Sequence, residues 1–209
     1  MNGIIIVVNS ILMLCCMTGC KKQDVKISDE DIAAIKSVIL KMYYASINGN
    51  KTAFVDCFPN TEAQKKLAIV CYDFSIAYRN FYRKILIKYG RNAWAKYLNT
   101  DIDGPAYTYR SKWPDSPSKL LAESAFIVTG DTVTVKCTNI DRDFVLKKHN
   151  GVWKLVIDYG NMTPDEYIKL AQRHMEAFHA AIKAMDTPDV TLKQIKILMS
   201  KIVLADMYK

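Results

Sequence analysis

The fold is decided by two stretches of sequence, 124-SAFIVTGDTVTVKC-137 and 144-FVLKKHNGVWKLVI-157. Apolar residues alternate with other residues through much of both stretches. A two-residue turn signal interrupts each one, Gly130-Asp131 in the first and Asn150-Gly151 in the second. Such pairs adopt the positive-φ backbone of the tight turns that join antiparallel strands. The two stretches therefore predict two β-hairpins, with strands at 124–129, 132–137, 144–149 and 152–157.

The position of each turn fixes which residues of a hairpin share a face. With Asn150-Gly151 as the loop, His149 pairs with Val152, and Leu146 then pairs with Leu155. This register collects apolar residues on one face of each hairpin. They are Phe126, Val128, Val133, Val135 and Cys137 in the first hairpin, and Phe144, Leu146, Trp153, Leu155 and Ile157 in the second. Two such hairpins predict a four-stranded antiparallel sheet whose apolar face packs on helices.

Helical periodicity precedes the hairpins. Residues 28–47 begin with a capping serine, carry apolar side chains at three- and four-residue spacing, and end before Gly49, which predicts an amphipathic helix. Residues 51–58 predict a short helix, and residues 61–98 predict a long helix with a break near Gly90. The apolar stripe of the long helix comprises Leu67, Val70, Phe74, Ala77, Tyr78, Phe81 and Ile85.

Two more helical patterns follow the hairpins. Thr163-Pro164-Asp165-Glu166 is a strong helix start, because it combines a capping side chain, a first-turn proline and two acids. A final apolar stripe runs through residues 192–202. The order of elements predicts an α+β protein. Amino-terminal helices pack on a curved antiparallel sheet of about four strands, and two carboxy-terminal helices follow.

Composition limits the class of protein. The chain has 209 residues, of which 50% are hydrophobic, enough to bury the core of one ordinary domain. Its net charge of +8 comes from 29 lysines and arginines against 21 aspartates and glutamates. A basic protein favours anionic surfaces such as phospholipid, polyanions or nucleic acid. The alternative interpretation is a solvated surface with surplus lysines.

The first 20 residues have the character of an export signal. They contain no charged side chain and one apolar run, interrupted only at Asn9-Ser10, which is too short to span a bilayer comfortably. The small residues Thr18 and Gly19 precede Cys20, and the polar residues 21–24 follow it at once.

Residues 17–20, MTGC, resemble a bacterial lipobox, in which the cysteine thiol receives a diacylglycerol before the signal peptide is cut. The resemblance implies a signal peptide at 1–19, a lipid on Cys20 and a tether at 20–27. It also implies a place in the bacterial cell envelope, held to a membrane and facing outside the cytoplasm. Two acyl chains on one residue suffice for stable anchoring. An ordinary signal peptide or an uncleaved membrane anchor are the alternatives.

The domain itself resembles the nuclear-transport-factor-2-like superfamily of cone-shaped α+β domains. The resemblance rests on 43-YYASINGNKTAFVDCF-58 and 149-HNGVWKLVID-158. It implies a cone-like domain at 28–162 with either a small-ligand pocket or a non-catalytic assembly role. Residues 163–209 form a helical extension beyond the usual end of that fold, which either covers the cone or lengthens it.

One segment stands out as a candidate binding site. The aromatic residues Tyr107, Tyr109 and Trp113 alternate with the cations Arg110 and Lys112. Aromatic faces interleaved with cations stack on sugars, bases or partner proteins. An edge strand that covers its own core has the same pattern.

No motif predicts catalysis, a cofactor or a metal site. Asp56 and Asp73 lie among tyrosines, as acid–base pairs do in some enzymes of the superfamily, but exposed carboxylates have the same pattern. His174 lies on an apolar stripe, and its spacing from His179 does not suit a shared metal. The cysteines after the signal are either buried thiols or one disulfide with one thiol; they are Cys57, Cys71 and Cys137.

These patterns leave three hypotheses for function. The first is a lipid-anchored envelope protein that binds another envelope protein or a small ligand without chemistry. The second is an enzyme of the same fold, and the third is a structural accessory of an envelope complex. We expect no nucleic-acid partner, because the chain carries an export signal and has no dense basic run.

Overall fold

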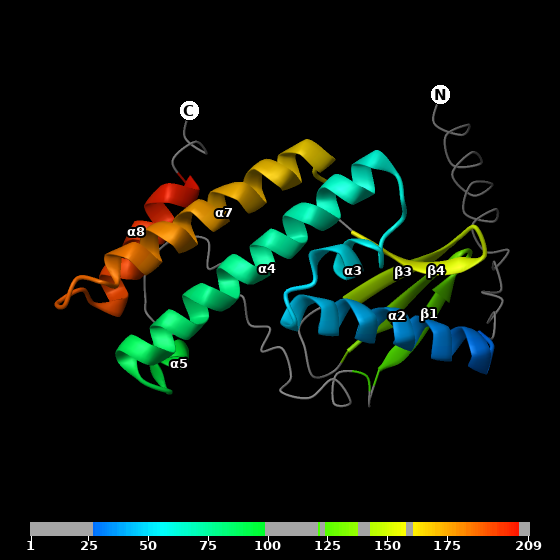
Figure 1. Cartoon of the computed structure of the whole chain (residues 1–209), viewed down its shortest axis with the longest axis horizontal. Helices are drawn as coiled ribbons and strands as arrows, with labels where there is room; N and C mark the ends of the chain where they lie inside the picture. The colour runs from blue at the N-terminus through cyan, green and yellow to red at the C-terminus, as the bar shows by residue number, and fades with distance from the viewer. Residues whose placement is uncertain (1–26, 99–120, 122–123, 138–142, 158–160, 205–209) are drawn as a thin grey trace, which may run out of the picture.

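The computed structural model describes residues 27–98, 121, 124–137, 143–157 and 161–204. Within this part the chain is an α+β protein, as predicted (Figure 1). The helices before the sheet are α2 (Asp29–Ile47), α3 (Lys51–Val55), α4 (Glu62–Tyr89) and α5 (Ala93–Leu98). The strands are β1 (Ala125–Thr129), β2 (Thr132–Lys136), β3 (Asp143–His149) and β4 (Val152–Val156). The helices after the sheet are α7 (Pro164–Ala184) and α8 (Leu192–Leu204).

The sheet has the simplest antiparallel topology, with the strands in the order β1-β2-β3-β4. The predicted register is confirmed: His149 pairs with Val152, and Leu146 pairs with Leu155. The turn between them requires a left-handed backbone, with φ of 51° at Asn150 and 78° at Gly151. Asparagine and glycine adopt this conformation more readily than other residues, so the turn alone sets the register of the second hairpin.

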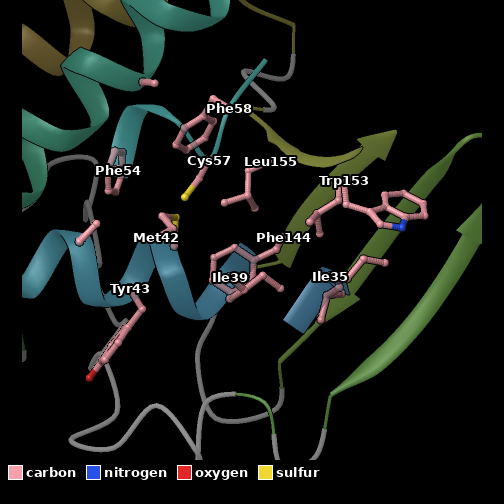
Figure 2. Close-up of a cluster of buried hydrophobic side chains, with 14 of the residues drawn as sticks. Ile35, Ile39, Met42, Tyr43, Phe54, Cys57, Phe58, Phe144, Trp153 and Leu155 are labelled. Carbon is pink, nitrogen blue, oxygen red and sulfur yellow. The ribbon is translucent and has the colours of Figure 1, made fainter. Parts of the chain in front are cut away.

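The apolar face of the sheet packs on α2 and α3 and forms the first of two cores, which we call the sheet core (Figure 2). Val135 and Leu146 at its centre are fully buried, as are Ile35 and Ile39 of α2. The opposite face of the sheet carries polar residues together with the half-exposed Ile127 and Val152. Because strand side chains alternate between faces, one register places the buried apolar residues of the hairpins, among them Val133, Leu146 and Leu155, together on the covered face.

Helix starts follow the capping signals in the sequence. The Ser28 side chain accepts a hydrogen bond from the Asp31 amide, and the Thr61 side chain accepts one from the Gln64 amide. At α7, Thr163 and Glu166 cap each other reciprocally. The predicted break near Gly90 is complete: Gly90 has φ of 89°, α4 ends one residue earlier, and α5 is a separate helix.

Helices α5 and α7 pack on the second half of α4, and α8 packs on α7 and α5; together they form the second core, which we call the helical core. At its centre the rings of Phe81 from α4 and Phe178 from α7 stack with centroids 5.2 Å apart. Figure 1 shows α4 running from the sheet to the opposite end of the molecule, with α7 beside it. The carboxy-terminal helices therefore build a core of their own on α4.

Hydrogen bonds tie the β4 edge of the sheet to the helices. The Leu155 amide donates to the Cys57 carbonyl (2.9 Å), and the Ile157 amide donates to Oε1 of Gln64 (3.3 Å). Trp153 Nε1 donates to the carboxylate of Asp31 in α2 (2.7 Å). These contacts hold the second hairpin against α2 and the start of α4.

We expect Leu146→Ala to lower the free energy of unfolding by about 3 kcal/mol, because it leaves a cavity in a fully buried part of the sheet core. Urea unfolding followed by circular dichroism measures the change. Ile127→Ala, on the exposed face of the same sheet, is the control and should cost well under half as much. Equal losses in the two variants would contradict the assignment of the buried face.

Candidate functional site

The residues singled out from the sequence as binding candidates lie outside the described part of the chain. This holds for the lipid-attachment candidate Cys20 and for the aromatic segment with Tyr107, Tyr109, Arg110 and Trp113. Their roles remain predictions. The described residues offer a different candidate binding surface, at the carboxy-terminal end of α2.

Two large apolar side chains are exposed together at the end of α2. Tyr44 and Ile47 are each 49% accessible to solvent, and their spacing of three residues places them on one face of the helix. Tyrosine is enriched in protein interfaces, because its ring covers a large area while its hydroxyl remains able to bond water or a partner. We call Tyr44 and Ile47, with the neighbouring Arg79 of α4, the α2–α4 junction.

Arg79 closes the end of α2. Its Nη2 atom donates to the Ser46 carbonyl (2.6 Å) and to the Ser46 hydroxyl (2.9 Å), and its Nη1 atom donates to the Ile47 carbonyl (3.3 Å). The last turn of α2 has no basic residue of its own, so a cation from α4 satisfies the carbonyls that a helix end leaves unpaired. Partial burial lowers the pKa of Arg79, and the like charge of Arg83 adds to this effect.

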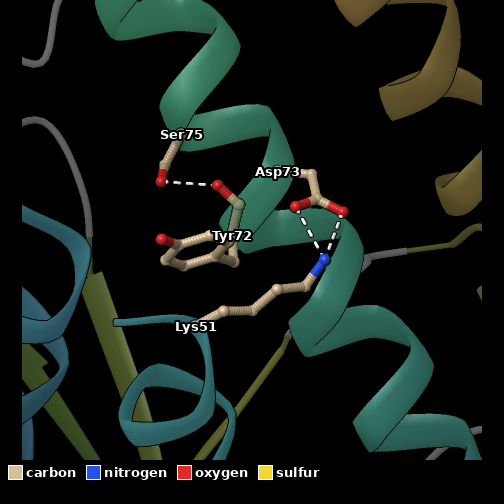
Figure 3. A network of polar contacts seen from close by, with 4 residues as sticks. All are labelled: Lys51, Tyr72, Asp73 and Ser75. Carbon is tan, nitrogen blue, oxygen red and sulfur yellow. Dashed lines mark hydrogen bonds and ion pairs between the residues drawn. The ribbon is translucent and has the colours of Figure 1, made fainter. Parts of the chain in front are cut away.

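A polar network on α3 and α4 lies beside this end of α2 (Figure 3). Lys51 Nζ lies 2.8 Å from both carboxylate oxygens of Asp73. The Ser75 hydroxyl donates to the Tyr72 carbonyl (2.7 Å) and shares a hydrogen bond of 3.2 Å with Ser46. These hydrogen bonds link α3 to α4 and α4 to α2 next to the exposed Tyr44 and Ile47.

The carboxylates and tyrosines considered as an acid–base site do not converge in the structure. Asp73 is paired with Lys51 at the surface, where both side chains are 44% exposed, and Asp56 ends the short helix α3. Tyr43 is buried in the sheet core, whereas Tyr78 packs in the helical core, where burial raises its pKa. Among the described residues the buried polar side chains are Ser46 and His174, and no carboxylate is buried.

His174 is a core residue, as the sequence favoured. Its side chain is 3% exposed and packs between Phe74 and Phe178, whose ring centroids lie 6.2 and 6.5 Å from the imidazole. Burial lowers the pKa of His174 to about 4, because the apolar surroundings disfavour the charged form. His179 on the same helix is exposed. The described residues contain no cluster of three or more side chains suited to hold a metal ion.

The three described cysteines are thiols rather than disulfide partners. Cys57 and Cys137 are buried, and burial raises the pKa of both, that of Cys57 to about 11. A raised pKa keeps a thiol protonated and unreactive at neutral pH. Cys71 is half-buried with its sulfur 3.6 Å from the Tyr167 hydroxyl. Of the two alternatives left open by the sequence, the described structure has the buried thiols.

The contacts at the α2–α4 junction were not visible in the sequence. Arg79 and its acceptors are more than 30 residues apart, and Lys51 and Asp73 are 22 apart. The one local signal was the absence of a basic residue from the last turn of α2, which leaves its carbonyls in need of a partner from elsewhere.

Comparisons with protein-family models, with curated proteins and with solved structures find no match to this chain. Within the residues described, no helix combines the length and apolar character needed to cross a bilayer. Function therefore has to be argued from the residues themselves.

We expect the protein to lose stability as the pH falls from 7 to 5. The pKa of His174 is about 4 in the folded state and 6.5 in the unfolded state, so the unfolded state binds more protons in this range. The cost is about 2 kcal/mol at pH 5. Urea unfolding at both pH values measures it.

The variant His174→Leu removes the titrating group and should flatten this pH dependence. His179→Leu, on the exposed side of the same helix, should leave it unchanged. A pH dependence that persists in His174→Leu would show that another group is responsible.

Proposed function

We propose that this protein is a lipid-anchored component of the bacterial cell envelope, whose α+β domain binds another envelope protein or a small ligand without chemistry. The observation that carries the proposal is the uncharged apolar segment that ends in Thr18-Gly19-Cys20 and gives way at once to Lys21-Lys22. The pattern matches the needs of lipidation, which are a thiol near the membrane surface and a small residue before the cut.

The acidic side chains whose pKa is shifted have structural roles in the described part of the chain. Lowered carboxylate pKa values occur at Asp31, Asp131, Glu166 and Asp186, and each of these side chains already has a structural partner, which for Asp131 is Lys147 with Thr132. Asp31 holds Lys148 and Trp153, Glu166 caps α7, and Asp186 pairs with Lys84. An acid–base enzyme would need a carboxylate buried in a concave pocket. An enzyme of the same fold remains the alternative, and a structural accessory of an envelope complex is the third candidate.

The order of elements is compatible with a cone-like domain over residues 28–162. Helices precede an open antiparallel sheet, and large apolar side chains fill the space between α2 and the sheet. A filled interior with apolar side chains displayed outside favours an assembly role over a small-ligand pocket. We place the protein-binding surface at the α2–α4 junction, on Tyr44 and Ile47.

The anchor is tested by the intact mass of the full chain, expressed in a bacterial host and extracted from membranes. We expect a product that begins at Cys20 and carries a diacylglycerol, and we expect Cys20→Ser to abolish the modification. Cys16→Ser, in the same apolar segment, is the control and should leave it intact. An unmodified product, or one cut at another residue, would contradict the proposal of a lipid on Cys20.

The binding surface is tested by a photo-crosslinking residue placed at Tyr44 in cells that make the protein naturally. We expect one discrete crosslinked protein, because exposed aromatic and aliphatic side chains together mark contact surfaces. Ser37, exposed two turns earlier on α2, is the control position and should give no such product. The same crosslinks from both positions, or none from Tyr44, would rule out this surface.

A further inference from the structure

The positive charge of the described chain is concentrated at one end of the molecule. Residues 74–98 and 177–204, which we call the basic end, contain ten lysines and arginines but only two acidic residues. They comprise the second half of α4, α5, the end of α7, and α8. The other described residues contain eleven basic and eleven acidic side chains. The excess of eight positive charges over the described chain therefore lies entirely in the basic end.

An exposed isoleucine lies within this end. Ile87 near the end of α4 is 81% accessible to solvent. Arg83, also exposed, lies four residues earlier and therefore on the same side of the helix. Arg91, exposed as well, follows in the turn after α4. An apolar side chain is thus presented to solvent one turn after Arg83, and Arg91 follows four residues later in the chain.

Other cations of the basic end have structural roles. Lys84 forms an ion pair with Asp186, and Lys88 donates to the carbonyls of Met185 and Thr187 at the end of α7. These contacts hold α7 on α4 and leave the exposed stripe with Arg83 and Ile87 on the outside. Ile87 contributes to neither core.

We propose that the basic end docks on an anionic phospholipid surface, with Ile87 entering the headgroup boundary and Arg83 and Arg91 lying against lipid phosphates. Apolar side chains flanked by cations bind membrane interfaces in this way. Burial of the apolar side chain away from water is favourable, and the cations are attracted by the negative potential of the anionic lipid surface. Two other anionic partners fit less well. An acidic peptide would offer no pocket for the projecting Ile87, and a nucleic acid would place Ile87 against its charged phosphate backbone. The docking does not require a lipid on Cys20, although an anchor would raise the local concentration of the membrane.

The test uses the full-length chain with an environment-sensitive fluorophore on Ile87→Cys, the unsubstituted chain giving the background from native cysteines. The protein is reconstituted into vesicles of phosphatidylcholine alone, or of equimolar phosphatidylcholine and phosphatidylglycerol. We expect the emission to shift to the blue in the anionic vesicles only, and the shift to shrink at high salt, which screens the attraction. A label on Ile127→Cys, an exposed isoleucine in the neutral part of the chain, should not respond.

Charge variants decide whether the arginines are responsible. In the labelled chain, Arg83→Gln with Arg91→Gln should weaken docking by roughly fivefold for each cation removed. Lys65→Gln with Lys136→Gln, which removes two exposed lysines elsewhere, should have no effect. Equal emission in both kinds of vesicle, or no effect of the arginine variants, would overturn the proposal. A shift produced by heparin but not by anionic vesicles would assign the surface to polyanions and overturn it as well.

The intact mass of the same sample reports separately on the anchor. A lipid-modified protein without the fluorescence shift would leave the anchor standing and disprove the docking. An unmodified protein that shows the fluorescence shift would support the docking and disprove the lipid anchor.

Discussion

The rest of the structure depends on α4, because this one helix contributes to both hydrophobic cores. Ala68 and Tyr72 in its first half face the sheet core, whereas Ala77, Phe81 and Ile85 in its second half face the helical core. A helix with partners on two sides must be apolar around much of its circumference. Between residues 67 and 79 no side chain of α4 is fully exposed. The sheet and the carboxy-terminal helices thus both pack on one continuous helix.

Long polar side chains of α4 complete this role by holding the ends of neighbouring elements. Arg79 bonds the last carbonyls of α2, Lys88 bonds carbonyls at the end of α7, and the Tyr89 hydroxyl donates to the Val190 carbonyl before α8. The carboxyl ends of helices carry unpaired carbonyls and a partial negative charge, so the cations Arg79 and Lys88 stabilise the ends of α2 and α7, while the Tyr89 bond holds the loop before α8. The basic character of α4 therefore has a structural cause in addition to any role at a membrane.

The basic end and the rest of the described chain differ in charge as well as in architecture. The part built around the sheet has balanced charges and exposes Tyr44 and Ile47 at the end of α2. The basic end has the excess of positive charge and exposes Ile87. In our proposal the first surface binds a protein and the second binds lipid.

The features that the sequence determined by itself are those set by neighbouring residues. The turn at Asn150-Gly151 set the register of the second hairpin, capping side chains set the helix starts, and Gly90 ended α4. The lipid-attachment pattern around Cys20 is equally local, so it could be proposed from the sequence alone. In these cases the decisive interactions span only a few residues.

The tertiary structure alone decided where the helices pack and which surfaces remain open. The predicted stripe of α4 included Phe81 and Ile85, but the burial of Ala68 and Tyr72 depends on the position of the sheet. Likewise, only the packing of α7 and α8 leaves Ile87 exposed beside Arg83, and only the approach of α4 to α2 brings Arg79 to Ser46. Such contacts join residues far apart in the chain. Periodicity reports which face of an element is apolar, but not which partner covers it.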